Sequence, residues 1–149
     1  MSQYVIKASK LSRNFGDLKA IQGLDLEVEK GRIYGFLGPN GCGKNTAIRL
    51  LTGVLKPSAG EVEVLGLKLP KNAEKLRLKI GYMTQKFSLY DYLTVKENLQ
   101  FVAKIYGLPG KLQKNRIDEL LSIYELDQKK NQLAGSMSGG QRQRLSLSA

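Results

Sequence analysis

Alternating apolar and polar positions predict strands in the first half of the chain. Residues 4–11, 24–29 and 61–65 alternate with a period of two, which is typical of strands with one buried face and one solvated face. Two further runs, 32–37 and 80–83, are richer in consecutive apolar residues, and we expect them to be short buried strands.

Helical spacing predicts amphipathic helices elsewhere. A first helix, ending before Pro57, has a core-facing stripe of Ala47, Leu50, Leu51 and Val54. Thr94 and Glu97 have the pattern of a capping box and start a second helix, whose expected apolar face is Val95, Leu99, Val102 and Tyr106. After a break at 109–110, a third helix presents Ile117, Leu120, Leu121 and Tyr124, so these two helices are expected to form a compact αα unit. A last helix is predicted over 142–149.

A glycine-rich run lies between residues 32–37 and the first predicted helix. It consists of Gly38, Pro39, Asn40, Gly41, Cys42, Gly43 and Lys44. Glycines at this spacing let successive backbone N–H groups turn inward around a phosphate chain, and the lysine adds a fixed positive charge. Because a strand-like segment precedes the run and a helix follows it, we interpret residues 38–44 as a nucleotide phosphate loop rather than an ordinary turn.

The position after this lysine departs from the phosphate-loop pattern. The pattern ends in Ser or Thr, whose hydroxyl is a Mg²⁺ ligand, whereas this chain has Asn45. Thr46 is not expected to replace it, because one residue along a helix rotates the side chain by about 100°. The amide oxygen of Asn45 is a hard ligand, but Mg²⁺ tolerates little error in distance or angle. Phosphate binding is therefore a stronger inference than metal-assisted hydrolysis.

Composition narrows the class of protein. With 149 residues and 42% hydrophobic content, the chain has the size of one domain with its own core. No apolar run approaches the roughly 20 residues that span a bilayer, so we expect a soluble, intracellular domain. The net charge of +11 is spread along the chain without basic blocks or interleaved aromatics, so no nucleic-acid partner is expected. The single cysteine, Cys42, is expected to be a small reduced residue.

Four landmarks follow one another in a fixed order. They are the turn Phe15-Gly16, the phosphate loop, the predicted strand ending at Gln85, and the run Met137-Ser138-Gly139-Gly140-Gln141. In this order the chain resembles the nucleotide-binding domain of ABC transporters. Residues 81–90, followed by 93–99, look most like the ATPase subunits of bacterial ABC-2 type exporters. The resemblance implies an α/β P-loop NTPase fold with an ABC-type antiparallel β subdomain and an α-helical subdomain over roughly 86–137.

The resemblance also implies roles for individual residues. Phe15 would stack on the adenine ring, Lys44 would hold phosphates, and Gln85 would reach the metal and the attacking water. Lys44 and Gln85 are thus the expected catalytic residues, and Asn45 and Gln85 the positions for Mg²⁺. The residues expected to contact ATP are Phe15, Gly38, Pro39, Asn40, Gly41, Cys42, Gly43, Lys44, Asn45, Thr46, Ser138, Gly139, Gly140 and Gln141. Alternatively, Phe15 is an ordinary core aromatic and Gln85 a solvated strand end.

Residues 138–141, here called the signature run, allow two compatible interpretations. Ser138 and Gln141 have the spacing of a capping box before a helix. The free N–H groups of a glycine-led helix start also form an anion site. In the family this site faces the γ-phosphate bound to a second subunit, which implies a head-to-tail dimer.

Later motifs of the family are not found in this sequence. They are an apolar strand ending in Asp-Glu and a switch histidine, whereas here Asp118-Glu119 lies within an amphipathic helix and histidine is absent. We therefore interpret residues 1–149 as a single incomplete ABC nucleotide-binding domain, with the C-terminal part of the core sheet missing.

The function that the resemblance implies is that of an ATP-binding subunit of a bacterial exporter. It would couple ATP binding and hydrolysis to transport through a membrane-embedded permease, and would be cytoplasmic and peripheral on the inner face of the membrane. Two alternatives stay open. One is a non-hydrolysing nucleotide-binding fragment, which Asn45 favours, and the other is a soluble ABC protein acting on ribosomes or DNA.

Overall fold

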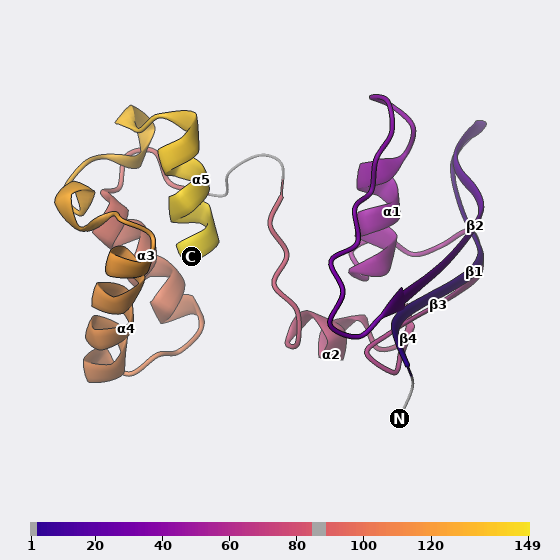
Figure 1. The fold of residues 1–149 in the computed structure, drawn as a ribbon, viewed down its shortest axis with the longest axis horizontal. Helices are drawn as coiled ribbons and strands as arrows, with labels where there is room; N and C mark the ends of the chain where they lie inside the picture. Colours follow the sequence, from indigo (N-terminus) through magenta and orange to yellow (C-terminus); the bar gives the residue numbers. More distant parts are fainter. Residues whose placement is uncertain (1–2, 85–88) are drawn as a thin grey trace. The chain divides into compact units, whose positions relative to one another are not determined.

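The computed structural model describes residues 3–84 and 89–149, which belong to two compact units, Met1–Tyr82 and Met83–Ala149 (Figure 1). The first unit contains a β-sheet with two helices, and the second consists of helices and short turns. In the described part of the chain, none of the helices combines the length and apolarity that crossing a bilayer requires.

A four-stranded antiparallel sheet forms the first unit. Its strands are β1 (Tyr4–Phe15), β2 (Leu18–Glu29), β3 (Ala59–Val64) and β4 (Leu67–Leu69). They are arranged in the order β2-β1-β3-β4. The turn between β1 and β2 passes through Gly16 at φ 57°. The predicted alternating strands are therefore confirmed, and the first two extend further toward their turn than the sequence pattern indicated.

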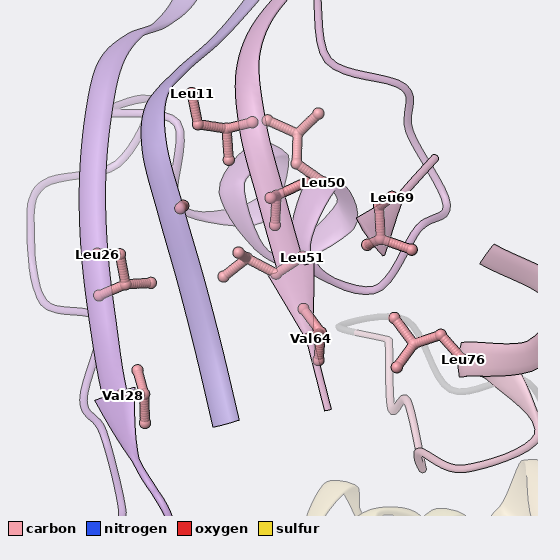
Figure 2. Close-up of a cluster of buried hydrophobic side chains, with 10 residues drawn as sticks. Leu11, Leu26, Val28, Leu50, Leu51, Val64, Leu69 and Leu76 are labelled. Atoms are coloured by element: carbon pink, nitrogen blue, oxygen red, sulfur yellow. The ribbon is translucent and has the colours of Figure 1, made fainter. Parts of the chain in front are cut away.

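The core of the first unit lies between one face of this sheet and the helices α1 (Lys44–Leu51) and α2 (Ala73–Arg77). Figure 2 shows Leu11 and Leu26 of the sheet together with Leu50 and Leu51 of α1. Leu11 and Leu50 are fully buried, which is worth about 1.5–3 kcal/mol for each such side chain. Val54 was expected on the same stripe, but it lies beyond the end of α1 and is exposed.

Two segments predicted to be buried strands form no strand. In residues 32–37 the side chains of Ile33 and Leu37 are exposed, and in residues 80–83 so is Met83. An apolar run is buried as a strand only where neighbouring strands pair with it and helices cover it. The strands among the described residues all pair within one antiparallel sheet, which includes neither segment. The predicted strands are therefore wrong for both runs, in which Phe36 and Ile80 are half-buried against the core and the other residues are exposed.

The second unit is helical. Its elements are α3 (Val95–Ile105), α4 (Gly110–Ile123), α5 (Gly139–Ser148) and the short 3-10 turns η1 (Asp127–Lys129) and η2 (Ala134–Ser136). Its buried cluster is made of Val95, Leu99, Ile117, Leu121, Leu126, Ala134, Met137 and Leu145. The predicted packing of α3 on α4 is confirmed. Tyr106 was expected on the apolar face of α3, but it caps the C-terminal end of that helix and is 74% exposed.

Helix α3 begins with the predicted capping box. The Thr94 hydroxyl accepts from the Glu97 N–H, and the Glu97 carboxylate accepts from the Thr94 N–H and hydroxyl at 2.8 and 2.7 Å. The pKa of Glu97 is lowered mainly by the hydrogen bond from the Thr94 backbone and, to a smaller extent, by the bond from the Thr94 hydroxyl. Desolvation acts in the opposite direction.

A buried asparagine ties the segment before α3 to that helix. Asn98 is 2% exposed. Its Oδ1 accepts from the Tyr90 N–H at 2.9 Å. Its Nδ2 donates to the carbonyl oxygens of Tyr90, Leu93 and Thr94 at 3.1, 3.2 and 3.0 Å. One side chain thus fixes the path of five consecutive residues.

Candidate functional site

The phosphate loop is fixed where it meets the sheet. Gly43 is the N-cap of α1 and has φ 88°, a left-handed conformation that favours glycine. A Cβ at this position would lie 2.6 Å from the Ala20 carbonyl oxygen and 2.8 Å from Cδ1 of Ile21. Only glycine therefore fits between β2 and the start of α1, and the sheet determines where the loop turns into the helix.

Lys44 places its charge over the loop. Its Nζ donates to the carbonyl oxygens of Gly38 and Pro39, at 2.6 Å each, and lies 3.5 Å from Sγ of Cys42. No side chain caps α1, and its first turn contains no acidic residue. The ammonium group and the N–H groups at the start of the helix therefore both favour an anion bound within the loop.

The other predicted loop residues lie on the accessible side of the site. Pro39, Asn40, Gly41 and Cys42 are exposed. Asn45 is exposed in the first turn of α1, and Thr46 beside it is half-buried. The structure thus brings these residues together around one loop, as the sequence predicted, while the contacts that each would make with a nucleotide stay a prediction.

Of the two positions predicted for Mg²⁺, the described residues include Asn45. At the predicted metal position Asn45 offers a single neutral amide oxygen, where the pattern has a hydroxyl. Within residues 3–84 and 89–149, no group of three or more acidic, histidine or cysteine side chains could hold a metal ion. Gln85, the other predicted metal and catalytic position, lies outside the described residues.

Phe15 ends β1 beside an arginine that sequence reasoning missed. The ring of Phe15 is 43% exposed, so it is not an ordinary core aromatic. The guanidinium carbon of Arg13 lies 4.6 Å from the ring centroid. These two residues are two apart in a strand and therefore share a face. That spacing could have identified the pair in advance.

The signature run has the predicted capping geometry at the start of α5. The Ser138 N–H donates to Oε1 of Gln141 at 3.0 Å, and the Gln141 N–H donates to Oγ of Ser138 at 3.4 Å. Gly139 and Gly140 are exposed, and a Cβ at either would meet no atom within 4 Å. Close packing within this chain therefore does not explain the two glycines.

An ion pair holds α5 beside the segment that Asn98 fixes. Nη2 of Arg142 donates to Oδ1 of Asp91 at 2.5 Å, and the Gly135 N–H donates to the Asp91 carbonyl at 3.0 Å. Sequence reasoning missed this pair, because the two residues are far apart in the chain. Asp91 thus fixes the start of the helix that carries the signature run.

Comparisons with known proteins agree with this arrangement. A family model described as ABC transporter matches residues 21–149. Over 143 residues the chain is 40% identical to the probable multidrug ABC transporter ATP-binding protein YbhF of Escherichia coli, covering 96% of this chain and 25% of that protein. It is also 40% identical over 143 residues to the bacitracin transport ATP-binding protein BcrA of Bacillus licheniformis, covering 96% of this chain and 46% of that protein.

A solved structure shows the same fold. The dimeric structure of MJ0796, a bacterial ABC transporter cassette, matches with a TM-score of 0.82 and 28% identity, covering 96% of this chain and 67% of that one. The chain spans between a quarter and a half of the length of the two curated relatives.

Proposed function

The chain belongs to the ABC transporter family, and we propose that it is the ATP-binding part of a bacterial exporter subunit. The relatives named for multidrug and bacitracin transport support the assignment to an exporter. The observation that carries the proposal is the phosphate loop, with Gly43 wedged against β2 and the Lys44 ammonium held over the loop.

The geometry supports the following binding mode for ATP. The triphosphate enters the loop, where its oxygens replace the carbonyls of Gly38 and Pro39 as acceptors of Lys44. The N–H groups at the start of α1 donate to the same phosphates. The adenine ring stacks on the exposed ring of Phe15. In the complete protein Gln85 positions the attacking water.

The partners of the proposed subunit are a second nucleotide-binding domain and a permease. The exposed start of α5, capped by Ser138 and led by Gly139 and Gly140, fits the γ-phosphate held by another copy. The dimeric form of MJ0796 supports this arrangement. Export requires a membrane-embedded partner, and we place this domain on the cytoplasmic face of the membrane beside it.

A second candidate function is nucleotide binding without turnover. Asn45 favours it, because a neutral amide replaces the hydroxyl that ligates Mg²⁺ in the phosphate-loop pattern. In that case ATP occupancy, rather than hydrolysis, would be the signal that the domain transmits.

Calorimetric titration of the chain with ATP, together with phosphate-release assays, tests both candidates. Lys44→Ala should weaken ATP binding by about tenfold or more, because it removes a charge-assisted contact. Lys30→Ala removes the same charge from an exposed position in the first unit and should leave binding unchanged. Phosphate release that depends on Lys44 supports the ATPase, and binding without release supports the second candidate. An ATP affinity that is unchanged by Lys44→Ala would refute both candidate functions.

A further inference from the structure

We propose that Arg13 is a positioning residue for the nucleotide base. In this proposal Arg13 covers one face of the Phe15 ring and fixes its orientation, so that the opposite face is presented to adenine. The inference rests on the proposed function, because it assumes that a nucleotide occupies the phosphate loop. It assigns a second residue to the base site, acting through Phe15 rather than by touching the nucleotide.

Arg13 is fixed at both ends of its side chain. Its backbone belongs to β1, and Nη1 donates to the Lys56 carbonyl at 2.9 Å. The neighbouring backbone is tied to the same connecting segment, since the Ser58 N–H donates to the Ser12 carbonyl at 2.8 Å and the Asn14 N–H donates to Oγ of Ser58 at 3.1 Å. The guanidinium group therefore has a fixed position and is not mobile in solvent.

The contacts of the guanidinium group point to stacking as its role. Its carbon lies 4.6 Å from the Phe15 centroid, within the range of a cation–π contact. In the described part of the chain, no carboxylate lies within ion-pair distance of Arg13, and Nε is buried without an acceptor. The ring and the Lys56 carbonyl thus determine where the group sits, and no acidic residue competes for it.

A ring fixed in advance binds a base better than a mobile ring. Phe15 is the last residue of β1 and lies at a turn, where a side chain exposed to this extent would otherwise sample several rotamers. Ordering a side chain during binding weakens the complex, and ordering it beforehand removes that penalty. Because aromatic stacking tolerates any base, the pair should strengthen binding of ATP and GTP alike.

The test compares ATP with inorganic tripolyphosphate, which lacks a base, on the full 149-residue chain. Arg13→Ala should weaken ATP binding by about two- to tenfold, the range of the ordering penalty for one side chain, and leave tripolyphosphate binding unchanged. In a Phe15→Ala background, Arg13→Ala should have no further effect. Arg77→Ala, which removes the same charge from an exposed position in α2, is the matched control and should change neither affinity.

Each outcome either supports or overturns the proposal. Equal losses for ATP and tripolyphosphate would show that Arg13 acts as a charge on the phosphates. A loss that persists without Phe15 would show that it does not act through the ring. Arg13→Lys keeps the positive charge but lacks the planar guanidinium group, and it takes the place of Arg13→Ala in this comparison if the alanine variant does not fold. A parent chain that binds neither ligand refutes the proposed function. Tripolyphosphate binding combined with ATP binding insensitive to Phe15→Ala refutes this inference and the stacking of adenine on Phe15, and leaves phosphate binding by the loop in place.

Discussion

Replacing Asn98 with alanine should strongly destabilise the helical unit. The three carbonyls that lose the Nδ2 donor each keep a backbone donor. The N–H groups of Leu93, Ala134 and residue 98 donate to the carbonyls of Tyr90, Leu93 and Thr94, respectively. The Tyr90 N–H, by contrast, loses its Oδ1 acceptor. Leaving one such donor unpaired costs about 1–3 kcal/mol, and removing a buried side chain adds to this. We expect a total loss of about 2–3 kcal/mol in the free energy of unfolding.

Thermal and urea denaturation followed by circular dichroism at 222 nm would measure this loss. For a unit of this size, 1 kcal/mol corresponds to about 4–8 °C, so the midpoint should fall by about 10 °C or more. Asn131→Ala is the matched control, because Asn131 is exposed in the same unit, and it should change stability by less than about 0.5 kcal/mol. An Asn98→Ala midpoint equal to that of the control would refute the reasoning.

Asn98→Asp separates hydrogen bonding from packing. The carboxylate keeps an acceptor for the Tyr90 N–H but faces the carbonyls of Leu93 and Thr94, to which Nδ2 of Asn98 donates. This variant should therefore be as unstable as Asn98→Ala at neutral pH and should recover in mild acid, where the protonated group donates one hydrogen bond. If its stability relative to the parent chain does not change with pH, packing rather than hydrogen bonding is the main role of Asn98.

Three further predictions concern the phosphate loop and the start of α3. ATP titrations with Mg²⁺ and with chelator should give similar affinities, because Lys44 is present while Asn45 replaces the hydroxyl ligand; a large Mg²⁺ requirement would show that Asn45 is a competent ligand. Alkylation of exposed Cys42 should block ATP binding by bulk, and prior ATP should slow the modification measured by mass spectrometry; no protection would mean that the loop does not enclose the phosphates. Because the pKa of Glu97 is lowered, the ionised carboxylate stabilises the fold above the pKa of Glu97 in the unfolded chain, and this stabilisation is lost as the pH falls through its pKa in the folded chain. Helicity should therefore decline less steeply in this acid range in Glu97→Gln than in the parent chain. Equal acid profiles would contradict this.

The local motifs and the buried stripes of the helices were predictable from the sequence, whereas the exposure of the apolar runs outside the sheet was not. The capping boxes at Thr94 and Ser138 depend on residues three apart, and both formed as expected. The burial of residues 32–37 depends on strands that must pair from elsewhere, and apolar composition alone cannot supply them. The same reasoning explains why the ion pair between Asp91 and Arg142 was missed, since it requires knowledge of how distant segments pack.

For the candidate site, the sequence located the loop but not what holds it. The glycine pattern identified residues 38–44, because the spacing itself encodes the turn. It did not show that Gly43 must fit against the Ala20 carbonyl. This contact depends on how the hairpin packs against the start of α1, which only the fold determines.

The position of β1 in the sheet also has a kinetic consequence. β1 pairs with β2 across a short turn, whereas its other edge pairs with β3, which comes much later in the chain. Closing a short loop costs less entropy than closing a long one, so the hairpin should form first and act as the template on which β3 and then β4 assemble. Changes at its turn, such as Gly16→Ala, should therefore slow refolding, while changes in β4 should mainly speed unfolding.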